Sequence, residues 1–516
     1  MIGTSIPQYM LIRTCILGFR LITPLAIFYV SFSLAEHPTS AGGRFLLAWS
    51  IIEALFWLLV YIPRKRALQA SAQHPPVLAK EDRKALFWKC WDKVPHPEYY
   101  VSRWFLGARS GEVRRENVKE FYAWALMNRG TESEDELVRR AQEDPDAKIE
   151  EEEELKEYVD GIETMLGRPI LPGRGPAKCL RLTIDDVDMR HRPVVWYMIV
   201  MLVDTLTAAY LRCNNFSLHR THLHSSLAIF PPRPASFFAR QLSPAQDLSY
   251  WYRPHTSKTR LPILFIHGIG IGLMPYSQWL SSINDEDPIS PADGEIGIIA
   301  IEIMPISFRL TRAMPRPEEL CRQINAILLR HGWDKVVLAS HSYGSVISTH
   351  LLKDAATAAK IGPCLFIDPV TFLLHLPDVA YNFTARRPRL ANEHQLWYFA
   401  SMDIMVAYTL ARNFFWSENI LWKDDLRARD VTVSLGGRDL IVDTEAVGKY
   451  ISGVDPKSEE RGWKDRAWKG SGVETLWWPT ADHAQVFERR EGRAKLAHVL
   501  REYAKRKEQV EDEEWL

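Results

Sequence analysis

Residues 335–350, KVVLASHSYGSVISTH, constrain the fold more than any other stretch of the chain. They predict a buried strand, a tight turn with Ser342 at its apex, and a helix from Ser345 onward. A serine at such an apex is held in a strained backbone conformation with its hydroxyl clear of the sheet. Because strand and helix nearly collide there, the residues two before and two after the apex must be small, as Ser340 and Gly344 are. The turn therefore departs from G-x-S-x-G only at its first position.

From residue 261 onward, short apolar segments alternate with segments of helical character. The strand candidates are 261–266, 296–303, 335–339, 363–367, 431–435 and 473–478. Short buried strands separated by helices predict a mainly parallel sheet that helices cover on both faces. Ligands of such sheets bind at the carboxyl ends of the strands, so we look for chemistry in the loops that follow them.

Composition argues against several classes of function. Lysine plus arginine and aspartate plus glutamate each number 64 in 516 residues, so no global field favours a nucleic-acid partner. The cysteines show neither disulfide nor zinc spacing, which predicts thiols in a reducing compartment and implies no metal. They are Cys15, Cys90, Cys179, Cys213, Cys321 and Cys364. The length allows two or three domains.

Residues 1–66 differ in kind from the rest of the chain. Apolar stretches at about 10–35 and 45–62 each approach the roughly 20 residues that cross a bilayer. Together they predict a transmembrane helical hairpin, with a cleaved signal peptide or a core hairpin of a soluble protein as the alternatives.

The positive charges of this hairpin lie on its outer flanks, at Arg13, Arg20, Arg64, Lys65 and Arg66. This distribution predicts that both ends face the cytoplasm. We therefore expect a multi-pass protein of the endoplasmic reticulum or another endomembrane, with the catalytic domain in the cytosol.

Residues 67–245 are expected to form a mainly helical region that precedes the last domain, 246–516. Within it, 194–211 is a third apolar run with Asp204 near its middle. An acid at that depth is expensive in lipid, so a buried or membrane-surface helix is favoured over a third span.

A glycine-rich turn, HGIG at residues 267–270, follows the first strand candidate. Such a turn lets backbone N–H groups donate to the charge that develops on a substrate oxygen during acyl transfer. The N–H of Tyr343 and that of Ile269 or Gly268 would form an oxyanion hole. The alternative is a tight loop that needs glycine only for its backbone.

A serine becomes nucleophilic when a histidine takes its proton and an acid fixes that histidine. Strand 431–435 ends in GGRDLIV, which puts Asp439 just beyond it. Strand 473–478 is followed by PTADH, which puts His483 on the same edge of the sheet. Serine, acid and histidine then follow in the order expected after a G-x-S-x-G turn.

Asp439 is the preferred acid, because the loop after the penultimate strand can reach under the histidine. Three rivals stay open. Asp368 also ends a strand, in FIDP, and Asp443 and Asp482 lie near suitable positions.

Residues of about 247–501 resemble the α/β-hydrolase superfamily, of the AB hydrolase-1 type, in the motifs HGIG, SHSYG, GGRDLIV and ADH. With the hairpin and the aromatic helical region, the whole chain also resembles the membrane-associated α/β hydrolases of fungi. The resemblance implies an α/β-hydrolase fold and a serine hydrolase with the triad Ser342, Asp439 and His483. No metal or organic cofactor is needed.

An insertion at 371–426, rich in aromatic and apolar side chains, resembles in position the cap or lid of enzymes with this fold. An apolar cap beside a membrane hairpin favours a lipophilic ester drawn from the bilayer. Alternatively, these aromatic side chains pack the core of the cap itself.

The sequence therefore predicts a membrane-anchored serine hydrolase, similar to lipases and esterases, that cleaves a lipophilic carboxylic ester through an acyl-enzyme. One alternative is an acyltransferase that uses the same triad. Another is a non-enzymatic scaffold with a hydrolase fold, held at the membrane. No oligomeric state is predicted.

Overall fold

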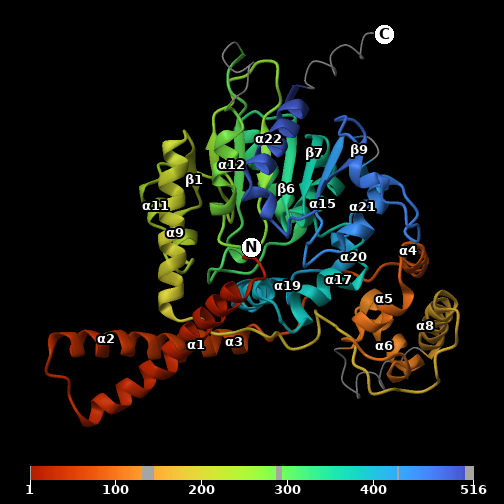
Figure 1. Cartoon of the computed structure of the whole chain (residues 1–516), viewed down its shortest axis with the longest axis horizontal. Helices are drawn as coiled ribbons and strands as arrows, with labels where there is room; N and C mark the ends of the chain where they lie inside the picture. Colours follow the sequence, from red (N-terminus) through yellow and green to blue (C-terminus); the bar gives the residue numbers. More distant parts are fainter. Residues whose placement is uncertain (1, 131–144, 286–292, 427–428, 506–516) are drawn as a thin grey trace.

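The computed structural model describes residues 2–130, 145–285, 293–426 and 429–505. At its centre lies a nine-stranded sheet in the order β2-β1-β3-β5-β4-β6-β7-β8-β9 (Figure 1). The strands are β1 (Ser217–Arg220), β2 (Gln241–Leu242), β3 (Ser249–Arg253), β4 (Ile263–Ile266), β5 (Ile298–Glu302), β6 (Val336–His341), β7 (Ile361–Ile367), β8 (Val431–Gly436) and β9 (Val473–Trp478). Strands β4 to β9 run parallel, whereas β3 is antiparallel to β5 and to β1.

The predicted mainly parallel sheet is confirmed, and each of the six strand candidates coincides with one of β4 to β9. Strands β4 to β8 were visible in the sequence because burial on both faces makes them largely apolar, whereas the edge strand β9 is only partly buried. Strands β1, β2 and β3 were not predicted. Two of them, β1 and β2, lie inside the segment 67–245, and they are too short and too polar to give a periodic signal.

Helices cover both faces of the sheet (Figure 1). They are α12 (Ser277–Ser282), α14 (Pro317–Arg330), α15 (Gly344–Lys353), α21 (Thr444–Ser452) and α22 (Arg490–Ala504). Alternate residues of β4 point to opposite faces: Phe265 shares a hydrophobic cluster with α12 and α22, and Leu264 shares the other with α14 and α15. Shorter connecting helices are α10 (Leu223–Leu227), α11 (Pro234–Phe238), α16 (Ala355–Ala358), η2 (Ser110–Glu112), η3 (Met274–Tyr276), η4 (Met304–Ile306), η8 (Gly462–Asp465) and η9 (Gln485–Phe487).

The turn between β6 and α15 has the strained geometry that the sequence predicts. Ser342 adopts φ +52°, in the left-handed region that a residue with a side chain rarely enters. A Cβ atom on Gly344 would lie 2.3 Å from the carbonyl oxygen of Ile266 in β4. The helix can therefore leave the strand this closely only because residue 344 has no side chain.

The N-terminal hairpin projects away from the sheet (Figure 1). It consists of α1 (Ile6–Ala35), α2 (Ala41–Phe56), the π-helix η1 (Trp57–Tyr61) and α3 (Ile62–Ala67). By length and composition, Ile6–Ala35 and Ala41–Ala67 could each cross a membrane. The acid of the second stretch, Glu53, is fully buried and accepts hydrogen bonds from Thr23 Oγ1 (2.5 Å) and from the backbone N–H of Val194 (2.8 Å). These bonds fix the base of the hairpin to the body.

The N-terminal half of α1 lies against the cap rather than free of the protein. The backbone N–H of Ile2 donates to Gln395 Oε1 (2.9 Å), and Ile12 and Ile16 share a hydrophobic cluster with Ala391 and Tyr398. The cap helices are α17 (Pro377–Ala380), η5 (Tyr381–Ala385), α18 (Ala391–Gln395), η6 (Leu396–Ser401), α19 (Ile404–Arg412), α20 (Trp416–Asn419) and η7 (Lys423–Leu426). The N-terminal half of α1 is therefore packed against the cap.

A helical region packs beside the cap. Its helices are α4 (Lys80–Trp91), α5 (Pro97–Trp104), α6 (Arg115–Met127) and α8 (Pro145–Leu166). Two indole N–H groups join it to the cap: Trp416 Nε1 donates to the carbonyl of Ala125 (2.9 Å), and Trp104 Nε1 donates to that of His375 (3.2 Å). The third apolar run forms α9 (Val194–Cys213), which packs at the edge of the sheet.

We expect Gly344→Ala to destabilise the fold by about 1–3 kcal/mol, because the added methyl group overlaps the Ile266 carbonyl in a rigid strand. The urea midpoint of the detergent-solubilised chain measures this. The matched control is Gly270→Ala, since a Cβ there meets no described atom within 4 Å. Equal midpoints for the two variants would contradict the steric explanation.

Candidate active site

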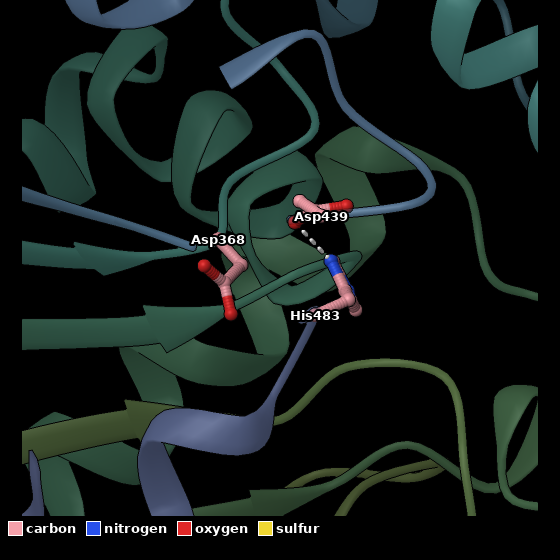
Figure 2. A group of neighbouring side chains, drawn as sticks. All are labelled: Asp368, Asp439 and His483. Carbon is pink, nitrogen blue, oxygen red and sulfur yellow. Dashed lines mark hydrogen bonds and ion pairs between the residues drawn. The ribbon is translucent and has the colours of Figure 1, made fainter. Parts of the chain in front are cut away.

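The structure brings Ser342, His483 and Asp439 together from three loops at the carboxyl ends of β6, β9 and β8. Ser342 Oγ lies 2.8 Å from His483 Nε2, and His483 Nδ1 lies 2.6 Å from Asp439 Oδ2. Figure 2 shows the second of these bonds. With Asp439 bonded to Nδ1, the ring carries its proton there and presents Nε2 as an acceptor to the serine hydroxyl.

The position of Asp439 is fixed by its own backbone neighbours. Its Oδ1 accepts the N–H groups of Ile441 (2.8 Å) and Val442 (3.0 Å), and its side chain is fully buried. Oδ2 is left to accept from His483. The loop therefore aims one carboxylate oxygen at the histidine.

Of the three rival acids, Asp443 and Asp482 hold other parts of the structure. Asp443 accepts the N–H of Ala446 (3.0 Å) at the start of α21. Asp482 Oδ1 accepts the N–H groups of His483 (2.7 Å) and Leu440 (3.1 Å), which ties the histidine loop to the acid loop.

Asp368, the third rival, lies beside the histidine but does not bond to its ring in the described structure (Figure 2). Its oxygens accept the N–H groups of Gly436 (3.0 Å) and Ala484 (2.8 Å). Burial raises the pKa of Asp368 above its usual value, and the Asp439 carboxylate raises it further although His483 opposes this. Asp368 thus provides a second carboxyl group near the imidazole.

The potential ligand atoms of Asp368, Asp439 and His483 lie within 4.8 Å of one another, which is a spacing that could hold a metal ion. Hydrogen bonds already engage both carboxylates and both ring nitrogens. This donor set favours proton transfer over metal binding.

The pKa of His483 is set by opposing effects. Burial lowers it, but the negative charge of Asp439 and the hydrogen bond to it, helped by Asp368 and Asp482, raise it to about 9. The site is therefore built to stabilise the imidazolium that forms when the ring takes a proton.

The expected oxyanion donors lie around Ser342. Tyr343 and Ile269 line the same cavity as the serine. The N–H of Gly268 donates to Tyr276 Oη (3.3 Å), which leaves Ile269 as the better candidate of the pair. A Cβ on Gly268 would lie 2.7 Å from the Cβ of Ser342, so the glycine permits the close approach of the two turns.

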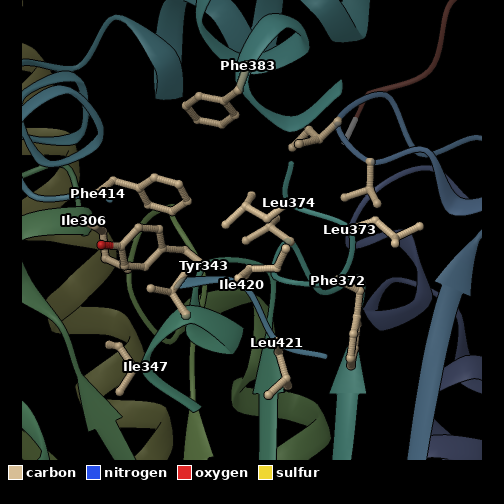
Figure 3. Packing of buried hydrophobic residues seen from close by; sticks show 14 of the residues in the cluster. Ile306, Tyr343, Ile347, Phe372, Leu373, Leu374, Phe383, Phe414, Ile420 and Leu421 are labelled. Atoms are coloured by element: carbon tan, nitrogen blue, oxygen red, sulfur yellow. The ribbon is translucent and has the colours of Figure 1, made fainter. Parts of the chain in front are cut away.

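Ser342 lies at the wall of a mostly apolar pocket that is partly open to solvent. Leu374, Phe383 and Phe414 of the cap face it together with Tyr343, as Figure 3 shows. Its other walls come from the helical region and the segment before it, and include His74, Val77, Leu78, Leu86, Trp104, Trp124 and Asn128. Among the described lining residues there is no Asp, Glu, Lys or Arg.

One residue near the site was missed in the sequence. The Asn392 side chain, buried in α18 of the cap, donates through Nδ2 to Asp482 Oδ2 (2.7 Å). It links the cap to the residue next to His483. A lone asparagine 90 positions away carries no signal in a single sequence, so only the fold reveals it.

No protein-family model matches the chain, and no curated protein matches its sequence. Its backbone is similar to that of several solved esterases. A bacterial membrane phospholipase A aligns with a TM-score of 0.37 and 12% identity over 60% of this chain and 94% of the other. Carboxylesterase CesB of Bacillus subtilis aligns with a TM-score of 0.32 and 12% identity over 59% of this chain and 98% of its own. An esterase of Thermogutta terrifontis aligns with a TM-score of 0.33 and 13% identity over 50% of this chain and 93% of its own. These TM-scores lie below 0.5, and the chemistry of the site rests on its own geometry.

We expect the rate at which a fluorophosphonate labels Ser342 to rise with pH well above 7, because His483 must be neutral to accept the serine proton and its pKa is raised. Asp439→Asn removes the charge that raises this pKa. In this variant, the pH range over which the labelling rate rises should move to lower pH, and the maximal labelling rate should fall by roughly 10⁴-fold.

The matched control is Asp443→Asn, whose carboxylate caps α21 instead of contacting the ring. Its pH profile should match that of the unmodified chain. An acid limb that stays in place in Asp439→Asn would show that another group sets the pKa of His483.

Proposed function

We propose that this chain is a membrane-anchored serine hydrolase of the α/β-hydrolase type, which cleaves a lipophilic carboxylic ester through an acyl-enzyme. One observation carries the proposal: the unbroken series of contacts from Ser342 Oγ through His483 to Asp439, at the wall of an apolar cavity. Support also comes from the sheet, because the three residues follow the carboxyl ends of β6, β8 and β9, which belong to its parallel part.

In the first half of the reaction, Ser342 Oγ attacks the ester carbonyl carbon as its proton passes to His483 Nε2. The N–H groups of Tyr343 and Ile269 donate to the carbonyl oxygen as it becomes negative. The C–O bond to the alcohol then breaks, and the departing oxygen takes the proton from His483. Asp439 keeps the ring oriented and stabilises its positive charge.

In the second half, a water molecule gives a proton to His483 and attacks the acyl-enzyme carbon. The bond to Ser342 Oγ breaks, the serine regains its proton, and the carboxylic acid leaves. In both halves His483 first accepts a proton and then returns it, to the departing alcohol oxygen in the first half and to Ser342 Oγ in the second.

The cavity favours an uncharged hydrocarbon chain near the serine. Its described lining has no Asp, Glu, Lys or Arg to pair with a charge, and most of the lining side chains are apolar. We therefore assign the substrate to neutral or long-chain esters, with any charged group held outside the cavity.

The hairpin would anchor the enzyme in an endomembrane such as the endoplasmic reticulum, with both ends and the catalytic body in the cytosol. Positive charge on both flanks supports this orientation. The contact of Ile2 with Gln395 also keeps the N-terminus on the same side as the cap.

We expect a fluorophosphonate to label the full-length chain and not Ser342→Ala, and we expect the same substitution to abolish hydrolysis of p-nitrophenyl esters. Ser345→Ala is the control, because its hydroxyl bonds within the turn to the Ser342 carbonyl (2.6 Å). Equal labelling of wild type and Ser342→Ala would exclude this nucleophile. Transfer of the acyl group to added alcohols in preference to water would identify an acyltransferase.

Leu374→Trp should lower kcat/KM for a long-chain p-nitrophenyl ester by roughly 10-fold or more and leave that for the acetate almost unchanged. The reason is that Leu374 is buried in the cavity wall, and the indole would occupy the space of the acyl chain. The control is Leu329→Trp, on the exposed side of α14. A parallel loss for both esters would indicate that the cavity does not hold the acyl chain.

A further inference from the structure

Helix α9 has two different faces. On its inner face, Asp204 pairs with Arg233 (3.2 Å) and with Arg309 (3.0 Å). Arg233 in turn pairs with Glu302 at the end of β5 (2.6 Å), and Trp251 Nε1 of β3 donates to the same carboxylate (3.0 Å). Two acids and two arginines thus form a balanced ionic cluster that fixes α9 to the edge of the sheet.

The outer face of α9 is apolar along the helix. Met198, Leu202 and Leu206 follow one another at spacings of four residues and are exposed, Leu206 by 61%. Ile199 and Tyr210 are exposed beside them. When a helix packs one face on the protein and exposes leucine and methionine on the other, the exposed face indicates a contact with another molecule or with a membrane.

The apolar surface continues onto the neighbouring helix α11. Arg212 at the end of α9 donates to the carbonyl of Ala235 (3.1 Å), so the two helices lie together. Phe237 and Phe238 of α11 are exposed, the latter by 79%. Two adjacent exposed phenylalanines are typical of side chains that enter a lipid interface.

The charge of this part of the chain indicates which partner it meets. In residues 194–242 the only acid is Asp204, which the ionic cluster neutralises. Three arginines of the same segment lie outside that cluster: Arg212, Arg220 and Arg240. The segment that carries the apolar face therefore has an excess of positive charge, which complements a bilayer with anionic headgroups.

The location of α9 next to the hairpin also favours contact with a bilayer. Helix α9 begins at the base of the hairpin, where the N–H of Val194 donates to Glu53. In Figure 1, α2 projects outward past the edge of the fold that α9 forms, so a bilayer that receives the hairpin would meet this edge.

We propose that the outer faces of α9 and α11 lie on the surface of an anionic bilayer, with α9 in the membrane plane. The apolar side chains then enter to a depth of about 5–10 Å. Helix α9 is long and apolar enough to cross a membrane. The ion pairs argue against such a span, because moving α9 into lipid would separate Asp204 from Arg233 and Arg309 and leave charges unpaired. The assignment does not depend on the chemistry of Ser342.

The test places a nitroxide on the full-length chain at one position at a time, by Met198→Cys, Leu202→Cys or Leu206→Cys, with the exposed Cys15 and Cys213 changed to serine. The chain is incorporated into vesicles of phosphatidylcholine with phosphatidylserine. Collision of the nitroxide with oxygen and with a water-soluble nickel chelate measures its depth. Glu153→Cys on α8 is the aqueous control, because its side chain is exposed in the helical region.

We expect the three labels to lie at one shallow depth, more accessible to oxygen than to nickel, and the Glu153 label to show the reverse. Phe237→Ser combined with Phe238→Ser should bring the Leu206 label closer to the water while the hairpin keeps the chain in the vesicles. Three labels as accessible to nickel as Glu153 would overturn the proposal. So would a label at Leu202 far deeper than the other two, which indicates a span. Spin–spin broadening that disappears on dilution with unlabelled chain would assign the face to a second copy instead.

Discussion

The hydrogen bond that His483 donates to Asp439 is the interaction on which the site depends. Without it the imidazole could rotate or carry its proton on the wrong nitrogen, and Ser342 would be an ordinary hydroxyl group. The structure supports this bond from both sides: backbone N–H groups hold Asp439, and Asp482 ties the histidine loop to the acid loop. The raised pKa of the ring reflects the concentration of carboxyl groups around it.

The cavity next to this bond is built by parts of the chain that lie far apart in the sequence. The sheet supplies the serine, the insertion at 371–426 supplies Leu374 and Phe414, and the region before the sheet supplies Trp104 and Trp124. The hydrogen bonds of Trp416 and Trp104 join the cap to the helical region and hold the two in place relative to each other. Under the proposed function, substrate selection would therefore depend on all of these parts and not on the sheet alone.

Much of the fold could be predicted because it follows from local physical requirements. Doubly covered strands must be apolar, and the turn at Ser342 must have a small residue at 344, so both leave a pattern in the sequence. The loops after β8 and β9 could be chosen because the carboxyl ends of parallel strands share an edge. The sequence could only rank Asp439 above Asp368, since both follow strands, and the 2.6 Å contact with His483 distinguishes them.

What could not be predicted involves contacts between distant segments. The short strand β1 forms because β3 offers it a partner, and its four residues have no pattern of their own. The exposed side of α9 could not be separated from its inner side until Arg233 and Arg309 were seen around Asp204. In each case the deciding partner lies tens of residues away.

The packing of α1 on the cap makes the hairpin more than a tether. Ile12 and Ile16 pack against Ala391 of α18 and Tyr398 of η6, and Asn392 of α18 donates a hydrogen bond to Asp482. A truncated chain that begins after the hairpin would expose Ala391 and Tyr398 and would remove the packing beside Asn392, which bonds to the residue before His483. Removal of the hairpin would therefore be expected to loosen the loop that holds His483, so the hairpin contributes to the order of the candidate site as well as to membrane attachment.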